Sequence, residues 1–237
     1  MTDFKTGMRR TIAATTAAWA MTAMISACCL LTAACSSDSY DSGTGAYSLV
    51  RADFVEAHSS AAGTIDYVLT DDNGRLTLTA PQQAGWASRA DSLYRAVLYY
   101  TPHDDGRAEV MTLAAIPVLR PKAIEEYEEG IKTDPLTFES IWTSANGKYI
   151  NIGFYLKNGS TGDASALHTI GMAALGVTDN ADGTRTAQLQ MYHNQGGMPE
   201  YYSSKYYVSM PLAGFDADSV AITINTYNGT ITRRLKI

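Results

Sequence analysis

Hydrophobic residues at every second position constrain the fold of this 237-residue chain more than any other feature. Ile150, Ile152, Phe154 and Leu156 alternate with polar, small or amphipathic neighbours, a period typical of half-buried β-strands. The same period recurs in Ile65/Tyr67/Leu69, Leu76/Leu78, Tyr206/Val208/Met210/Leu212, Val220/Ile222/Ile224 and Ile231/Leu235/Ile237. Beyond its N-terminal region, the sequence therefore predicts β-structure almost throughout.

Short dipeptides of Asn-Gly or Asp-Gly separate these alternating runs. They are Asn73-Gly74, Asp105-Gly106, Asn146-Gly147, Asn158-Gly159, Asp182-Gly183 and Asn228-Gly229. Such dipeptides accept positive φ at little cost, which is the requirement of a tight hairpin turn. The chain is therefore expected to form antiparallel sheets built largely from hairpins.

An acidic segment without alternation, residues 120–130, precedes Asp134-Pro135 and predicts a domain boundary. Five strands are expected before it, with a non-alternating piece after the third, the order of a small OB-type barrel. Six or seven strands follow it and predict an antiparallel β-sandwich. The expected divisions are a signal peptide at 1–34, a tether at 35–45, an OB-like domain at 46–119, a linker at 120–132 and a sandwich at 133–237. The expected sandwich core comprises Trp142, Ile150, Ile152, Phe154, Leu189, Met191, Val208, Met210, Val220, Ile222 and Ile224.

The N-terminal region has the layout of an export signal. Arg9-Arg10 precedes an uncharged stretch that ends in small residues before Cys35, after which the chain turns polar. This arrangement resembles the lipobox of bacterial lipoproteins and predicts that Cys35 is lipidated and holds the protein at a membrane surface without a spanning helix. Cys28 is the alternative anchor, because Ile25-Ser26-Ala27 precedes it. An uncleaved membrane span over 11–34 is a further alternative.

Charge and cysteine content narrow the function. Removal of residues 1–34 takes away three basic residues and one acidic residue, which leaves 15 basic and 23 acidic residues and a net charge of −8. Nucleic-acid binding needs a basic surface, so no nucleic-acid partner is expected. All three cysteines lie at or before Cys35, so the exported fold is expected to contain no disulfide.

The order of these features resembles a known family. A lipoprotein signal, an OB-like domain, Asp134-Pro135 and the run Ile141-Trp142 to Gly147–Ile152 are similar to the NigD-like lipoproteins of Bacteroidota. The resemblance implies an N-terminal OB domain, a C-terminal β-sandwich and an accessory or immunity role beside a bacteriocin. Leu119-Arg120 departs from the Thr-Lys that the family often carries at the end of the last OB strand. No catalytic residues are known for this family, so none is carried over.

The sequence shows no spacing of histidine, acidic or serine residues that is typical of a metal site or a catalytic motif. His58, His103, His168 and His193 lack metal-ligand spacing, although the last two can face each other on neighbouring strands. The loop 179–183 fails the calcium-loop pattern at its third and fifth positions. No Gly-x-Ser-x-Gly elbow is present. We therefore expect no enzyme activity, no cofactor and no metal.

Tyrosine is the one compositional oddity, and it is densest over residues 201–207. Tyrosine suits both cross-strand packing and binding surfaces for peptides or glycans. The candidate partner-binding residues are Tyr201, Tyr202, Tyr206 and Gln195, the last within the candidate loop 195–199. The expected function is that of a non-catalytic envelope lipoprotein, at the outer membrane, that binds a peptide or protein. Alternatives are a structural subunit of a surface assembly, a glycan-binding lipoprotein and a glycan hydrolase.

Overall fold

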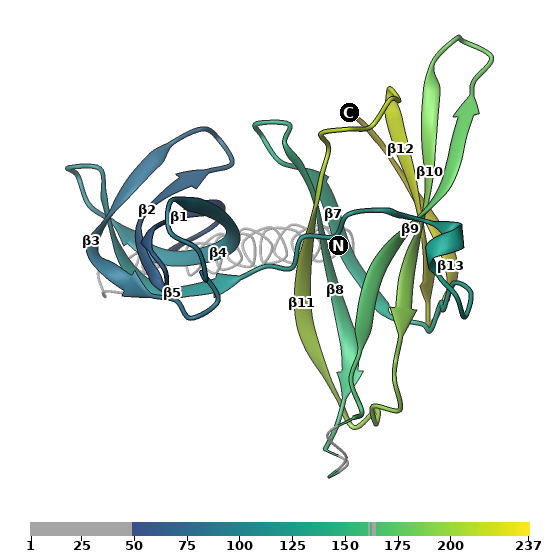
Figure 1. Ribbon diagram of the computed structural model, residues 1–237, viewed down its shortest axis with the longest axis horizontal. Helices are drawn as coiled ribbons and strands as arrows, with labels where there is room; N and C mark the ends of the chain where they lie inside the picture. Colours follow the sequence, from purple (N-terminus) through teal and green to yellow (C-terminus); the bar gives the residue numbers. More distant parts are fainter. Residues whose placement is uncertain (1–48, 161, 163–164) are drawn as a thin grey trace, which may run out of the picture. The chain divides into compact units, whose positions relative to one another are not determined.

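The computed structural model describes residues 49–160, 162 and 165–237, and residues 49–237 form one compact unit. The expected signal peptide, the tether 35–45, Cys28 and Cys35 lie outside the described residues. Within these described residues, strands follow one another with one short 3-10 helix between them (Figure 1). The elements are β1 (Arg51–Ala61), β2 (Thr64–Thr70), β3 (Arg75–Gln83), β4 (Ser92–Pro102), β5 (Arg107–Ala115), β6 (Lys122–Ala123), η1 (Ile124–Glu126), β7 (Thr137–Thr143), β8 (Tyr149–Asn158), β9 (Thr169–Asp179), β10 (Arg185–Asn194), β11 (Tyr202–Pro211), β12 (Ser219–Thr226) and β13 (Gly229–Lys236).

In the described part of the chain, none of the helical segments has the length and apolar content that a bilayer span requires.

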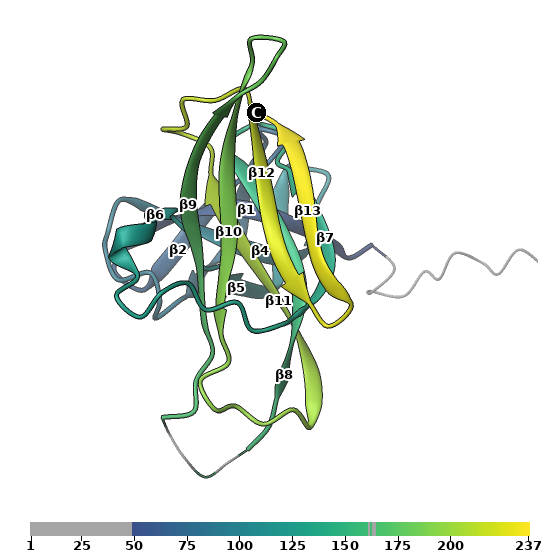
Figure 2. The same cartoon turned by 90° about the vertical axis from the view of Figure 1, so that its right-hand side faces the viewer.

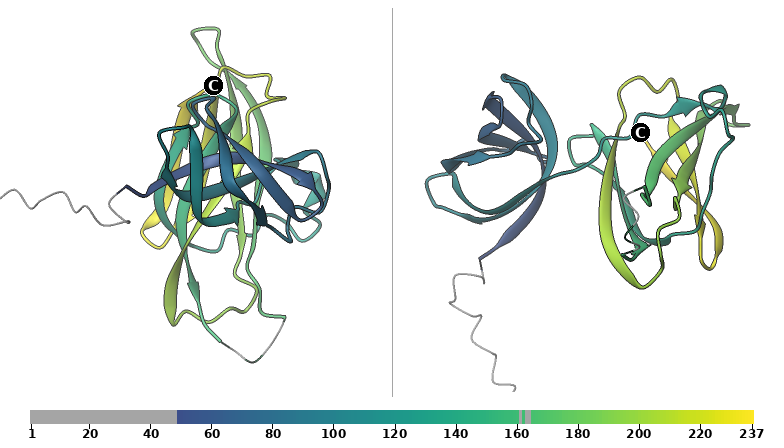
Figure 3. Two further views of the ribbon diagram at one scale, coloured as in Figure 1. Left: turned by 90° about the vertical axis from the view of Figure 1, so that its left-hand side faces the viewer. Right: turned by 60° about the horizontal axis from the view of Figure 1, so that its bottom comes forward.

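The first five strands close into a barrel in the order β1-β2-β3-β5-β4, with β4 paired back onto β1 (Figure 3). All pairs are antiparallel except a short parallel contact between β3 and β5. This is the five-stranded barrel that the sequence predicts. Five of the eleven buried core residues are alanines, so the interior of this narrow barrel is filled largely by small side chains. The core comprises Val55, Ala57, Ile65, Val68, Leu78, Ala84, Ala87, Ala96, Leu98, Tyr100 and Ala108.

The remaining strands form two sheets that enclose the second core. Figure 2 shows the larger sheet, in the order β13-β12-β10-β9-β6, and the smaller sheet has the order β11-β8-β7. The all-β fold with a barrel followed by a sandwich is therefore confirmed. The buried sandwich core comprises Leu119, Leu136, Ile150, Ile152, Phe154, Leu156, Met172, Ala187, Leu189, Met191, Val208, Met210, Val220, Ile222 and Ile224.

Strand direction departs from the expected antiparallel pattern at two places in the larger sheet. Strands β10 and β12 run parallel, and the two-residue strand β6 pairs in parallel with β9. The chain leaves the larger sheet after β10, forms β11 in the opposite sheet and returns as β12 in the direction of β10. The Asn-Gly and Asp-Gly turn dipeptides predict hairpins, but they do not predict a connection that passes through the other sheet.

Five of the six predicted turns connect antiparallel neighbours, and the sixth does not. Asn158-Gly159 ends β8, and the chain then crosses to β9 in the other sheet. A Cβ on Gly159 would lie 2.7 Å from Cβ of Pro199 and 2.8 Å from Cδ2 of Tyr201. The glycine therefore allows a close approach of two loops, whereas Gly147 occupies positive φ in a true hairpin turn.

The segment predicted as a linker, residues 120–132, contributes to the sandwich. Strand β6 pairs with β9, and the hydroxyl of Tyr127 donates to the carbonyl of Met172 over 2.9 Å. Tyr127 also stacks on Tyr192 of β10. The larger sheet is therefore extended by residues that the sequence suggests are irregular.

Trp142 is a correction to the expected sandwich core. Its partner across the β7–β8 pair is Asn151, on the face opposite Ile150 and Ile152. Its ring instead meets Phe54 of β1 edge to face, with centroids 5.2 Å apart. The other ten expected core residues are buried as predicted. The tryptophan therefore joins the outer face of the smaller sheet to the barrel. The sequence prediction was wrong here because period-two alternation does not show which face of a strand is buried until the strand register is known.

Arg95 of β4 joins the barrel and the sandwich through a buried polar network. Its guanidinium donates to both carboxylate oxygens of Asp71 over 2.6 and 2.7 Å, to Oγ of Ser209 over 3.1 Å and to Oδ1 of Asn151 over 3.0 Å. Its guanidinium also lies 4.2 Å from the centre of the Tyr149 ring. Planar, bidentate pairing of this kind is characteristic of arginine and fixes orientation.

Glu56 of β1 forms a second polar contact between the two regions. Lys148 Nζ donates to one of its carboxylate oxygens over 2.7 Å, and the Tyr149 hydroxyl donates to the other over 2.8 Å. Burial acts to raise the pKa of Glu56, but these two hydrogen bonds, together with the positive charges of Lys148 and Arg95, hold the pKa below its usual value. Burial, with the bond to Glu56, raises the pKa of Tyr149 to about 12. The outer face of the smaller sheet is thus fastened to β1 and β4.

Candidate partner-binding groove

An open groove of about 690 Å³ runs along the outer edge of β11. Lys205 and Tyr207 line it from one face of the strand, and Tyr206 and Val208 line it from the other. Because both faces contribute, the groove follows the edge of the strand rather than covering either face. The other wall is largely apolar and includes Val97, Tyr99, Ala114, Ala115, Pro117 and Ile170.

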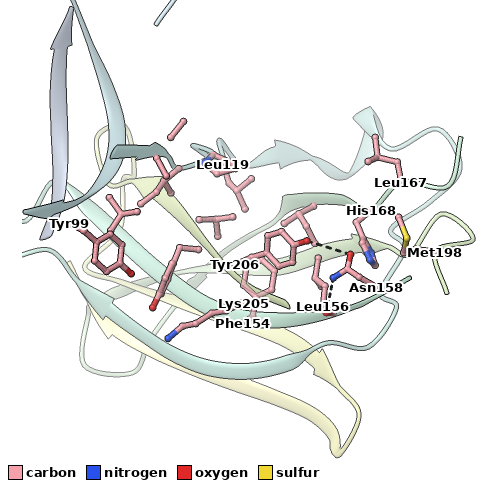
Figure 4. A pocket seen from close by; sticks show the side chains of 18 residues that line it. Tyr99, Leu119, Phe154, Leu156, Asn158, Leu167, His168, Met198, Lys205 and Tyr206 are labelled. Atoms are coloured by element: carbon pink, nitrogen blue, oxygen red, sulfur yellow. Dashed lines mark hydrogen bonds between the residues drawn. The ribbon is translucent and has the colours of Figure 1, made fainter. Parts of the chain in front are cut away.

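Figure 4 shows how far this groove extends. Tyr99 lies at one end, Tyr206 lies near the middle beside Phe154, and Leu167 and Met198 lie at the other end. The ring of Tyr206 stacks on that of Phe154, with centroids 6.3 Å apart. Apolar walls with a few polar groups are typical of sites that accept a ligand.

The backbone of β11 is open on the side of the groove. The strand pairs with β8 along its whole length, and Ser209 makes two further backbone bonds outward: its N–H donates to Pro117 O over 3.0 Å, and its carbonyl accepts from Leu119 N–H over 2.8 Å. Backbone groups alternate in direction along a strand, so Tyr207, Lys205 and Ser203 also point outward. Among the described residues, no strand or bridge pairs with this stretch.

Lys205, which lines the groove, forms an ion pair with Glu139. Its ammonium group donates to Oε1 of Glu139 over 2.6 Å and lies 4.9 Å from the centre of the Tyr207 ring. The bond to Glu139 raises the pKa of Lys205. The centre of the groove therefore presents a paired cation and does not call for a charged ligand.

His168 and His193 meet at the far end of the groove. Nδ1 of His168 lies 3.0 Å from Nε2 of His193, which confirms that these two rings face each other. The remaining ring nitrogens lie 3.0 Å from the carbonyl of Lys157 and 2.9 Å from the carbonyl of Asp134. Burial and the neighbouring ring lower the pKa of His193. The pair therefore ties together segments from four places in the chain.

The candidate residues from the sequence lie in different settings. Tyr206 lines the groove. Tyr201 and Tyr202 are 78% and 60% exposed at the start of β11, outside the groove lining. The side chain of Gln195 donates to the carbonyl of Met198 over 2.8 Å and lies 3.2 Å from Glu200, so it supports the loop that bears Met198. Met198, in the loop 195–199 that the sequence singles out, lines the groove, and Tyr99 reaches it from the distant strand β4.

Within residues 49–160, 162 and 165–237, no group of three or more histidine, cysteine, aspartate or glutamate side chains can hold a metal ion. The two facing histidines have hydrogen-bond partners on all four ring nitrogens and lack a third ligand.

Comparison with known families identifies the C-terminal half. Residues 120–237 match the model of the NigD-like C-terminal β-sandwich domain. The chain belongs to the NigD-like family. The resemblance that the sequence carries is therefore confirmed, and the match covers all of the sandwich strands from β6 to β13.

Solved structures share the fold at low sequence identity. A NigD-like immunity protein from Bacteroides caccae is 23% identical with a TM-score of 0.60, over 77% of this chain and 91% of that one. A putative toxin-related protein from Parabacteroides distasonis is 18% identical with a TM-score of 0.60, over 79% and 93%. A putative lipoprotein from Bacteroides fragilis is 10% identical with a TM-score of 0.56, over 79% and 97%. No curated protein sequence matches the chain significantly.

Proposed function

We propose that this chain is a non-catalytic, lipid-anchored envelope protein that binds a protein or peptide partner through the groove beside β11. The observation that carries the proposal is the coincidence of an apolar groove with an unpaired strand edge. The NigD-like immunity protein from Bacteroides caccae supports an accessory or immunity role beside a bacteriocin. The partner is then a secreted peptide or another envelope protein.

Anchoring through Cys35, at the outer membrane, is part of this proposal, with Cys28 as the alternative cysteine. The putative lipoprotein from Bacteroides fragilis supports it, as does the order of charged, apolar and small residues before Cys35. Cys35→Ala is expected to block processing and leave a larger precursor, whereas Cys28→Ala is not. Intact-mass measurement of membrane-extracted protein distinguishes the two, and unmodified protein in the soluble fraction would refute anchoring.

Partner contact is assigned to the groove, with Tyr206 in its lining, Gln195 in the loop that bears Met198, and Tyr201 and Tyr202 at the start of β11. The test is affinity recovery of the tagged full chain from cross-linked envelopes. Tyr206→Ala is expected to lower recovery of the specific partner about tenfold, the scale of a large contact residue. Tyr227→Ala is the matched control, because Tyr227 is similarly exposed and lies outside the groove lining. Recovery of no partner by the unaltered chain would refute the function.

The alternatives have less support. A structural subunit that polymerises by donating its terminal strand requires that strand to be unpaired, but β13 pairs with β12 from Gly229 to Lys236. Glycan binding favours exposed aromatic rings, and Tyr201 and Tyr202 provide two. An apolar groove that continues along a backbone edge favours a peptide over a sugar.

A further inference from the structure

The outer edge of β11 offers hydrogen-bonding groups that a peptide backbone can satisfy. Ser203, Lys205 and Tyr207 each direct an N–H and a carbonyl toward the groove, in the alternation set by Ser209. An unpaired row of this kind is a template for another extended chain. The side chains of Lys205, Tyr206 and Tyr207 within this stretch line the groove.

The same edge already holds one extended segment of the chain itself. Residues 117–119 run alongside Ser209, and Val118 bridges to it in parallel. This contact shows the geometry that the edge accepts, namely an extended backbone at ladder distance. The next outward-pointing positions continue that ladder without a partner among the described residues.

The groove supplies places for the side chains of such a strand. Alternate side chains of an added strand point to opposite faces. One set would lie beside Tyr206 and Ile170, and the other beside Tyr99 and Tyr207. Both settings are apolar or aromatic. Because Glu139 already neutralises Lys205, nothing in this region selects a charged side chain.

We propose that the partner binds as an extended, uncharged peptide segment that adds a strand to β11 opposite Ser203–Tyr207 and places apolar side chains into the groove. This mode of recognition takes its affinity from main-chain hydrogen bonds and its specificity from pockets for alternate side chains. The inference rests on the proposed partner-binding function and specifies how that partner is held.

The test uses the full chain and a defined probe, an acetylated and amidated peptide of alternating threonine and valine, about seven residues long. Hydrogen exchange is followed at single amides. In the free protein, Lys205 and Tyr207 are expected to exchange quickly, whereas Tyr206 and Val208, which bond to β8, are expected to exchange slowly. Saturating peptide is expected to slow exchange at Lys205 and Tyr207 at least tenfold. Unchanged exchange at both amides overturns the proposal.

Two variants at one position separate backbone from side chain. Lys205→Pro removes an outward N–H and leaves the β8 ladder in place, because proline is tolerated on an edge whose N–H faces away from the sheet. It is expected to weaken peptide binding about tenfold or more, the scale of one or two lost hydrogen bonds. Lys205→Thr loses the same lysine side chain but keeps the N–H, so it is expected to bind the peptide about tenfold more tightly than Lys205→Pro does. Equal binding by both variants overturns strand addition.

Other occupants of the edge give different results. Slow exchange at Lys205 and Tyr207 in the free chain at every concentration means that its own N-terminal segment fills the edge, and slow exchange that appears only at high concentration means a second copy. Either result overturns the proposal that a partner peptide adds a strand to this edge. If Lys205→Pro recovers the envelope partner as well as Lys205→Thr does, strand addition fails while the proposed function stands. Recovery of no partner by any variant is the failure of the function itself.

Discussion

The barrel and the sandwich solve the same problem of unpaired strand edges in different ways. In the barrel, β4 pairs back onto β1, so every strand has neighbours on both sides. In the sandwich, two separate sheets end in edge strands, and β11 is one of them. Closure removes the backbone groups that another chain can use. The difference teaches that an OB-like barrel here is the less suitable half for binding an extended peptide, although its fold is often associated with ligands.

The two cores differ as well. Alanine fills much of the barrel interior, whereas the sandwich interior is built from isoleucine, leucine, methionine and phenylalanine. Burial of large aliphatic side chains stabilises more per residue than burial of alanine, because more apolar area leaves water. The sandwich therefore carries more of the hydrophobic stability, and the barrel depends more on its hydrogen-bonded closure and on its polar contacts with the sandwich.

The largest expected effect comes from cutting the polar contact between the regions. Arg95→Leu leaves the carboxylate of Asp71 largely buried without its partner, which costs about 3–5 kcal/mol because the side chains of both residues are mostly or fully shielded from water. Guanidinium denaturation should also split into two transitions, one for each region. The double variant Arg95→Leu/Asp71→Leu is the control and should lose much less. A single transition with a loss under about 1 kcal/mol would show that the two regions do not depend on this network.

The next effect tests the sandwich core alone. Ile222→Ala removes a fully buried side chain and should lower the free energy of unfolding by about 2–5 kcal/mol, while Ile222→Val should cost about 0.5–1.5 kcal/mol. Chemical denaturation measures both values. Hydrogen exchange within β1–β5 should change less than exchange within β8–β12. Equal loosening of both regions would mean that they unfold only together.

The barrel core should respond to added volume. Ala96 is fully buried on β4, so Ala96→Leu should destabilise the protein by about 1–3 kcal/mol through overpacking. Ala114→Leu, at a more exposed position on β5, serves as the control and should be close to neutral. A stabilised Ala96→Leu variant would show that the small side chains leave unfilled space.

The smallest effect is the opposite response of the two regions to pH. Hydrogen bonding to Asp66 raises the pKa of His58 in the barrel, so its stabilisation is complete below the unfolded pKa and is lost as the pH rises through the folded pKa. Burial lowers the pKa of His193 in the sandwich, so the sandwich loses stability as the pH falls below the unfolded value of about 6.5. Thermal unfolding of the two variants His58→Gln and His193→Gln is measured between pH 8 and 5. The first should remove the loss of stability at rising pH, and the second should remove the loss at falling pH. Parallel trends in the two variants would contradict the opposite assignments.

Local patterns in the sequence predict most of this fold because they act over a few residues. The alternation of Ile150, Ile152 and Phe154 correctly places them in the core, and Asn146-Gly147 correctly marks a hairpin. The same dipeptide at Asn158-Gly159 has another cause, the close approach of Pro199 and Tyr201. Glycine satisfies both requirements, and a single sequence does not distinguish them.

Features that depend on strand register are harder to predict. The face that Trp142 presents depends on its pairing with Asn151, and the open edge of β11 depends on which strand fails to pair with it. The groove brings together Tyr99, Tyr206 and Met198, three residues spread over about half of the chain. The tyrosine-rich run indicated Tyr206 and the loop 195–199 contains Met198, but no local signal brings Tyr99 of β4 to the same groove.

The bridge between Val118 and Ser209 also limits how far an added strand can extend along β11. Beyond Ser209, the edge of β11 is occupied by the chain itself, so an incoming strand has only the stretch from Ser203 to Tyr207 to lie against. At about 3.3 Å per residue, that stretch spans about 17 Å. The length of the free edge therefore limits how many residues of a partner can pair with β11. A longer partner chain has to turn away from the sheet at the barrel end.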